Sequence, residues 1–267
     1  MRDRISSILI GAALAALISL PAKAGDPNWV TRPQRNFDIK SLKIDDVVGT
    51  LKVEVKDGGP ATLQISGLKQ RVDGLTIAQT NGVLSIKGHN AQSVWDWSHW
   101  FDFSYNDTKP DQLFVHLTIA KGTRVDVDDI NGKATIGNTE GEMHFSSAGY
   151  TESTIGNVTE ATISLAGSGK VRLGNVSGKL HAETAGSGDI RTGNASEAHA
   201  EIAGSGSIST GNIVGGLHVE IMGSGDVTFG GVAVDPHIES MGSGNVRLKA
   251  YRGNLSNEGN ANLKIGN

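Results

Sequence analysis

The chain has 267 residues, 36 glycines, 6 prolines, no cysteine and a formal net charge of −4. The lack of cysteine excludes disulfides and cysteine–zinc sites, and the mild negative charge argues against a nucleic-acid partner, which a basic surface would attract. Abundant glycine with little proline indicates regular tight turns rather than disorder.

The N-terminus has the pattern of a secretory signal peptide. Arg2 and Arg4 precede an uncharged apolar run over residues 5–20, and Ala22 and Ala24 supply the small residues of a cleavage site. A transmembrane anchor is the alternative, but the run is shorter than the roughly 20 residues that spanning requires. The sequence therefore predicts a signal peptide over 1–24 and export to the periplasm or the cell surface. No integral membrane segment is expected after cleavage.

The mature chain is predicted to begin with a short leader and to continue as one β domain. Residues 25–36 are polar and include two prolines, so we expect an exposed leader. Alternation of apolar and polar residues then predicts strands throughout 37–267. Asn81-Gly82, between two such strands, is typical of a tight hairpin turn.

A stretch rich in aromatic residues interrupts this pattern at about 89–110. Exposed aromatic rings bind sugars or anchor protein partners, so the stretch is a candidate binding site. The alternative is a lid that covers an end or flank of the β domain. The residues concerned are Trp95, Trp97, Trp100, Phe101, Phe103 and Tyr105.

From Ile130 onward the sequence repeats every 18 or 19 residues, as in AGSGKVRLGNVSGKLHAET at 166–184. Each copy holds a Gly-Ser-Gly corner, an alternating strand, a Gly-Asn corner and a second strand. Such a repeat predicts an all-β solenoid, a single-stranded parallel β-helix whose coils bury their apolar faces against one another. The alternative is the left-handed hexapeptide β-helix, but that fold is three-sided, and copies of 19 residues break a period of six.

The asparagines of the Gly-Asn corner fall in register from copy to copy. Stacked asparagines can form hydrogen bonds along the column through their amide groups, and they tolerate left-handed backbone conformations. We therefore assign a structural ladder to Asn138, Asn157, Asn175, Asn194 and Asn212.

Stacking the copies also predicts two outward columns on the second strand, one of histidine and one of glutamate. Imidazoles from adjacent coils, about 4.8 Å apart, could converge on Zn²⁺ with a glutamate completing the site. The alternative is a solvated polar face copied by duplication. No other cofactor is expected. The columns consist of His181, Glu183, His199, Glu201, His218, Glu220, His237 and Glu239.

Acidic residues form the third candidate constellation. The spacing of Asp126 and Asp128 places both on one outer face, with Asp129 next to them and Asp45-Asp46 in a similar phrase. Paired carboxylates serve polysaccharide hydrolases. The sequence fixes no His, Lys or Arg beside them, so no catalytic residue is predicted and the acids are interpreted as polar strand and turn positions.

The phrases GSGDI at 186–190 and GSGDV at 223–227, alternating with strands that end in TGN or LGN, resemble the head GIN domain family of autotransporter adhesins. The resemblance covers 37–267. It implies a right-handed, pectin-lyase-like β-helix without a recognised catalytic set, and a role in cell adhesion.

We therefore expect an exported, non-catalytic β-helical scaffold for binding or adhesion. Its expected partners are a glycan or a cell-surface protein, and a second copy of the chain could pair with the open end of the helix. The alternative is a polysaccharide-active lyase or hydrolase on the same fold.

Overall fold

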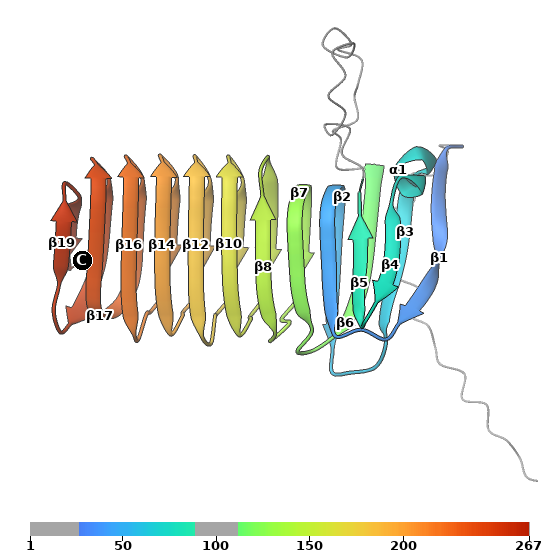
Figure 1. Ribbon diagram of the computed structural model, residues 1–267, viewed down its shortest axis with the longest axis horizontal. Coiled ribbons are helices and arrows are strands. Elements are labelled where there is room, and N and C mark those ends of the chain that lie inside the picture. Colours follow the sequence, from blue (N-terminus) through green and yellow to red (C-terminus); the bar gives the residue numbers. More distant parts are fainter. Residues whose placement is uncertain (1–26, 89–111, 267) are drawn as a thin grey trace, which may run out of the picture.

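Short alternating stretches between glycine corners build a rod of stacked coils. A computed structural model of the chain describes residues 27–88 and 112–266, and Figure 1 shows the coils side by side along the rod. From β8 onward, successive coils pair in parallel, so that a residue lies beside the one 17 to 19 positions later, as His181 lies beside His199 and His199 beside His218. The predicted parallel β-solenoid is confirmed.

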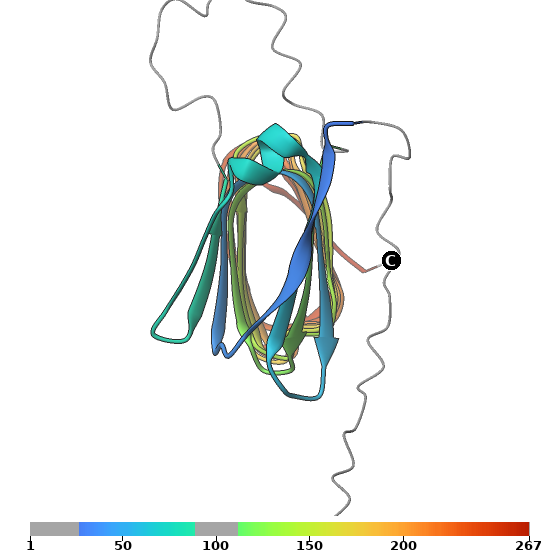
Figure 2. The ribbon, with the colours of Figure 1, turned by 90° about the vertical axis from the view of Figure 1, so that its right-hand side faces the viewer.

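Each coil contributes one strand to each of two long sides, which we call side 1 and side 2. The end-on view in Figure 2 shows a flattened ring with these two sides, unlike the three-sided hexapeptide helix. Side 1 is formed by β8 (Glu142–Ser147), β10 (Glu160–Gly167), β12 (Lys179–Gly186), β14 (Glu197–Gly204), β16 (Gly216–Gly223), the second half of β17 (Asp226–Gly242) and β19 (Ser256–Gly259). Side 2 is formed by β9 (Thr151–Ile155), β11 (Lys170–Leu173), β13 (Asp189–Thr192), β15 (Ser207–Thr210), the first half of β17, β18 (Asn245–Arg252) and β20 (Asn262–Ile265).

The core is a set of aliphatic columns between the two sides. Strands place alternate side chains inward, so Ala182 and Val219 of side 1 face Ile190 and Ile208 of side 2, and all four are buried. Each buried aliphatic side chain stabilises the fold by roughly 1.5–3 kcal/mol. A further inward column follows the asparagine corner, and it was not predicted: Val158, Val176, Ala195 and Ile213.

The Gly-Ser-Gly corners need glycine because successive corners touch. Gly204 has φ +132°, and a Cβ at this residue would lie 2.5 Å from the carbonyl oxygen of Gly186 in the coil before. Any other side chain would therefore force adjacent coils apart.

The asparagine corners are joined by side chain–backbone hydrogen bonds. The Oδ1 of each asparagine before Asn212 accepts a hydrogen bond from the backbone N–H of the next asparagine. The distance is 2.9 Å from Asn194 N to Asn175 Oδ1 and 2.8 Å from Asn212 N to Asn194 Oδ1. None of the five ladder asparagines uses the left-handed backbone conformation that asparagine tolerates. Among the described residues the left-handed positions outside glycine are Asp46, Asn81, Asp129, Glu140 and Asp235.

Antiparallel pairs and two long strands form the N-terminal end of the rod. β2 (Ser41–Lys56) and β7 (Arg124–Ile136) pair with each other along both sides and turn the corner at Asp46 and Asp129. Beyond them lie β5 (Val83–Lys87) and β4 (Thr76–Thr80) on side 1, and β6 (Leu113–Ala120), β3 (Ala61–Leu68) and β1 (Trp29–Phe37) on side 2. The short helix α1 (Lys69–Asp73) was not predicted.

Two expectations for this end can be compared with the structure. The hairpin at Asn81-Gly82 is present, with φ of 52° and 78° as a type I′ turn requires. Residues 29–36 are mostly exposed, as expected of the leader, but they form the edge strand β1 of the β domain instead of preceding it. Their side chains are mostly exposed because β1 pairs with β3 along one edge, which explains the missing alternation.

The signal peptide over 1–24 lies outside the described residues. So do the aromatic residues Trp95, Trp97, Trp100, Phe101, Phe103 and Tyr105, so their role stays a prediction. In the described part of the chain, no helix has the length and apolar character to cross a bilayer.

The glycine before each corner asparagine gives a test of the stacking. A Cβ at Gly193 would lie 2.4 Å from Oδ1 of Asn175. We expect Gly193→Ala to lower the free energy of unfolding by about 1–3 kcal/mol through this overpacking, measured by urea unfolding.

Gly216→Ala is the matched control, because a Cβ there meets nothing within 4 Å. It should change the stability by no more than about 0.5 kcal/mol. Equal stabilities of the two variants would contradict the close packing of the corners.

Candidate functional site

The outward positions of side 1 form four rows that run along the rod. The charged row is Arg124, Glu142, Glu160, Lys179, Glu197, Gly216 and Asp235. The histidine row is Asp126, His144, Thr162, His181, His199, His218, His237 and Ser256. The glutamate row is Asp128, Ser146, Ser164, Glu183, Glu201, Glu220, Glu239 and Glu258. The alanine–methionine row is Ala166, Ala185, Ala203, Met222 and Met241.

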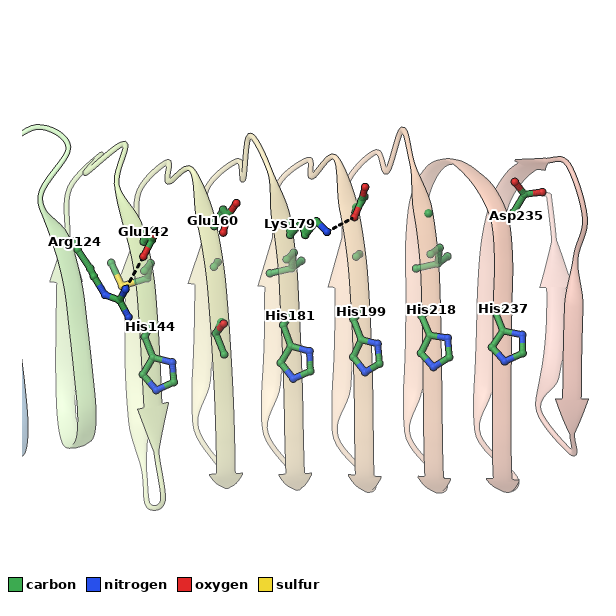
Figure 3. A pocket seen from close by; sticks show the side chains of 18 residues that line it. Arg124, Glu142, His144, Glu160, Lys179, His181, His199, His218, Asp235 and His237 are labelled. Atoms are coloured by element: carbon green, nitrogen blue, oxygen red, sulfur yellow. Dashed lines mark hydrogen bonds and ion pairs between the residues drawn. The ribbon is translucent and has the colours of Figure 1, made fainter.

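Four imidazole rings of the histidine row stack face to face. The ring centroids lie 4.8 Å apart from His181 to His199, 4.7 Å from His199 to His218 and 5.0 Å from His218 to His237. The planes are within 12–19° of parallel. Figure 3 shows the rings in line, because the parallel register gives each ring the same place on its strand.

Glutamates of the neighbouring row contact two of these rings. His218 Nε2 lies 2.8 Å from Glu220 Oε1, and His237 Nε2 lies 2.7 Å from Glu239 Oε1. Each pair is separated by two positions on one strand, which places both side chains on the same face. One strand thus places a nitrogen atom and an oxygen atom that can each ligate a metal next to each other.

His199 occupies the least favourable position for a positive charge. Burial is the main cause that lowers the pKa of His199, and the neighbouring His181 and His218 lower it further. Glu220 and Glu201 act in the opposite direction and only partly offset these effects. These effects favour the neutral imidazole of His199, the form that can ligate a metal.

The N-terminal end of the rows brings together residues that the sequence left apart. Asp126 pairs with His144, and Asp128 Oδ1 accepts a 2.8 Å hydrogen bond from Ser146. His144 Nε2 lies 3.7 Å and Lys43 Nζ 3.5 Å from Asp128 carboxylate oxygens. Sequence analysis assigned no His or Lys to the two acids. The structure places one of each beside Asp128, because both come from neighbouring coils.

The hydrogen bond from Ser146 lowers the pKa of Asp128, and the positive charge of Lys43 adds to this, while burial opposes both. Asp126 Oδ1 is buried and has no hydrogen-bond partner. The remaining acids have other roles. Asp129 accepts from the backbone N–H of Ala148 at the corner, and Asp45 forms an ion pair with Lys87 at 3.2 Å.

A groove of about 640 Å³ runs along side 1 between the charged and histidine rows. Its charged wall contains the ion pairs Arg124–Glu142, at 2.7 Å, and Lys179–Glu197, at 3.3 Å (Figure 3). The floor of the groove is formed by apolar residues whose side chains point into the core: Met143, Ala161, Leu180, Ala198 and Leu217. The groove thus offers opposite charges, ring nitrogens and apolar surface over several coils.

Sequence analysis found the central part of the histidine and glutamate rows and missed their ends. The predicted residues from His181 to Glu239 do lie in two adjacent rows. Asp126, Asp128 and Glu258 were not assigned to these rows. Counting one coil length, 18 or 19 residues, back from His144 or forward from Glu239 would have found Asp126 and Glu258.

The lowered pKa of His199 predicts how stability depends on pH. Between the pKa of the folded chain and the ordinary value of 6.5, the unfolded chain binds more protons than the folded chain. This contribution to stability is therefore complete above pH 6.5 and is lost as the pH falls through that window. We expect the free energy of unfolding, measured with urea at several pH values, to change less with pH between pH 5 and 7 in His199→Gln than in the wild type. Thr162→Ser, a non-titrating change in the same row, should keep the pH dependence of the wild type. An unchanged pH dependence in His199→Gln would refute the lowered pKa of His199.

Comparisons with known proteins agree with this architecture. The fold is similar to a crystal structure described as a "putative adhesin" from Bacteroides fragilis, with a TM-score of 0.60 and 15% identity over 83% of this chain and 97% of that one. It is also similar to two proteins of Parabacteroides distasonis. One is described as a "putative adhesin", with a TM-score of 0.56, 17% identity and coverage of 90% of this chain and 98% of that one. The other is described as a "putative lipid binding protein", with a TM-score of 0.58, 17% identity and coverage of 91% and 97%.

At these identities the neighbours show the fold alone, and no curated protein matches the chain. The model of the domain family described as "Putative auto-transporter adhesin, head GIN domain" matches residues 43–251. This range spans most of the two paired long strands, the stacked coils up to β18, and all four rows of side 1 apart from Ser256 and Glu258. The chain therefore belongs to the head GIN domain family.

Proposed function

We propose that the chain is an exported, non-catalytic adhesion scaffold that binds its partner through side 1. The observation that carries the proposal is the groove of about 640 Å³, which continues over several coils of a rigid rod. Family membership indicates a binding or adhesion role and an exported, surface-associated protein. Periplasm and cell surface are the two compartments that the expected signal peptide allows.

The composition of side 1 suits a macromolecular partner better than a small molecule. Beside the charged and histidine rows, the alanine–methionine row adds apolar surface at the corner, where Met222 is 42% and Met241 71% exposed. Apolar residues that lie together on a surface are typical of interaction sites. An extended glycan or a cell-surface protein can contact many coils at once and gain from their repetition.

Nothing favours the polysaccharide-active alternative as a second proposal. Asp126 and Asp128 do lie close together, but Asp128 is already engaged by Ser146 and Lys43. Pairing of two copies through the C-terminal end of the rod stays a prediction.

Adhesion assays with matched face variants test the proposal. Beads coated with the chain should adhere to at least one surface in a panel of neutral polysaccharides, acidic polysaccharides and cultured cells. Lys179→Ala/Glu197→Ala removes an ion pair that lines the groove. We expect it to weaken adhesion about fivefold or more, as loss of a contact worth about 1 kcal/mol does.

Lys170→Ala/Asp189→Ala is the control, because these residues are paired on adjacent coils of side 2. It should leave adhesion unchanged. Equal losses in the two variants, or cleavage of a polysaccharide by the wild type, would refute a non-catalytic binding role for side 1.

A further inference from the structure

We propose that His199, His218 and Glu220 form a binding site for a divalent transition-metal ion such as Zn²⁺. Their three donor atoms, one per residue, all lie within 4.8 Å of one another. Two nitrogens and one carboxylate oxygen are a donor set that zinc uses with water in the fourth position. His199 and His218 also line the groove described above, but the proposed metal site does not rest on the adhesion role.

Half of the site is already assembled by one strand. His218 Nε2 and Glu220 Oε1 are 2.8 Å apart in β16. Two donors on a tetrahedral zinc are about 3.4 Å apart, given Zn–ligand bonds of about 2.0–2.1 Å. A separation only slightly larger than the present one thus suffices for these two residues to chelate an ion.

His199 supplies the third donor from β14, which pairs directly with β16. In the stacked arrangement its ring is nearly parallel to that of His218, with an interplanar angle of 12°. Parallel rings cannot both point a nitrogen lone pair at one ion between them, so binding must tilt the rings out of the stack. Both side chains are only partly buried, which leaves room for such a change of rotamer.

The electrostatic surroundings favour a cation at this place. Glu201 and Glu239 flank Glu220 in the glutamate row, so carboxylates follow one another along three coils. Their negative potential attracts a divalent ion and compensates for the loss of its hydration shell.

One other group of donors competes in the described part of the chain, namely Asp126, Asp128 and His144. It is less suitable because the Lys43 ammonium lies 3.5 Å from Asp128 and repels a metal cation. Asp128 also accepts the hydrogen bond from Ser146. The proposal therefore assigns the ion to the histidine pair.

Titration of the tag-free chain with zinc chloride in a calorimeter at pH 7.5 tests the site. We expect one strongly bound zinc per chain. His218→Gln and Glu220→Gln should each weaken binding by at least about tenfold, since even residues that only orient metal ligands have effects of about 10–100-fold. With Co²⁺ in place of zinc, the wild type should show the intense visible absorption of a tetrahedral site, and His199→Gln should lose it.

His237→Gln is the matched control, because it removes the next ring of the same stack with its own glutamate partner. It should keep the wild-type affinity within about twofold. Melting temperatures without zinc verify that all the variants are folded. No zinc binding by the wild type overturns the proposal, and so does equal weakening by His237→Gln and His218→Gln. A loss in Asp128→Asn without one in His218→Gln overturns it in favour of the aspartate cluster.

Discussion

The structure depends on an unbroken register between parallel coils. Hydrogen bonds hold neighbouring coils about 4.8 Å apart, so every side chain lies over its counterpart in the next coil. Coils of 19 and 18 residues alternate between Ile136 and Ser209, and the extra residue must not disturb this register. It is a glycine placed after the asparagine corner: four positions separate Val176 from Leu180, but only three separate Ala195 from Ala198. The corner absorbs the insertion, and the inward and outward faces of the strands are preserved.

The repeat made most of the solenoid predictable from the sequence. Gly-Ser-Gly and Gly-Asn mark the corners because only glycine permits the contacts seen at Gly193 and Gly204. The N-terminal end was less predictable. Residues 29–36 do not alternate since they pair along one edge, and nothing in their composition distinguishes an edge strand from a leader.

The central rows of side 1 followed from coil length alone. The contacts of His144 and Lys43 with Asp128 did not follow from coil length. They depend on side-chain rotamers and on the pairing of β2, which carries Lys43, with β7, which carries Asp128.

The same register that stabilises the core also concentrates like side chains on the surface. Stacking like side chains has an electrostatic cost, since two imidazolium groups about 4.8 Å apart repel by roughly 1 kcal/mol even in water. The flanking glutamate row moderates that repulsion, and Glu220 and Glu239 each contact a ring. Side 1 therefore combines a fixed spacing of the rings with a position, His199, where burial and two neighbouring rings disfavour a positive charge. Side 2 carries no comparable row of histidines in the described residues.

The irregularity in β1 makes the two ends of the rod unequal as templates for assembly. Its pairing with β3 shifts register between Arg32 and Arg35, and Pro33 lies within the shift. A proline has no N–H to donate, and a bulged edge does not offer the straight row of donors and acceptors on which another strand could add. Growth of fibrils by repeated head-to-tail addition is thereby disfavoured at the N-terminal end of the rod. Contact between two C-terminal ends would instead be self-limiting, because a two-fold pair uses up the edge it joins.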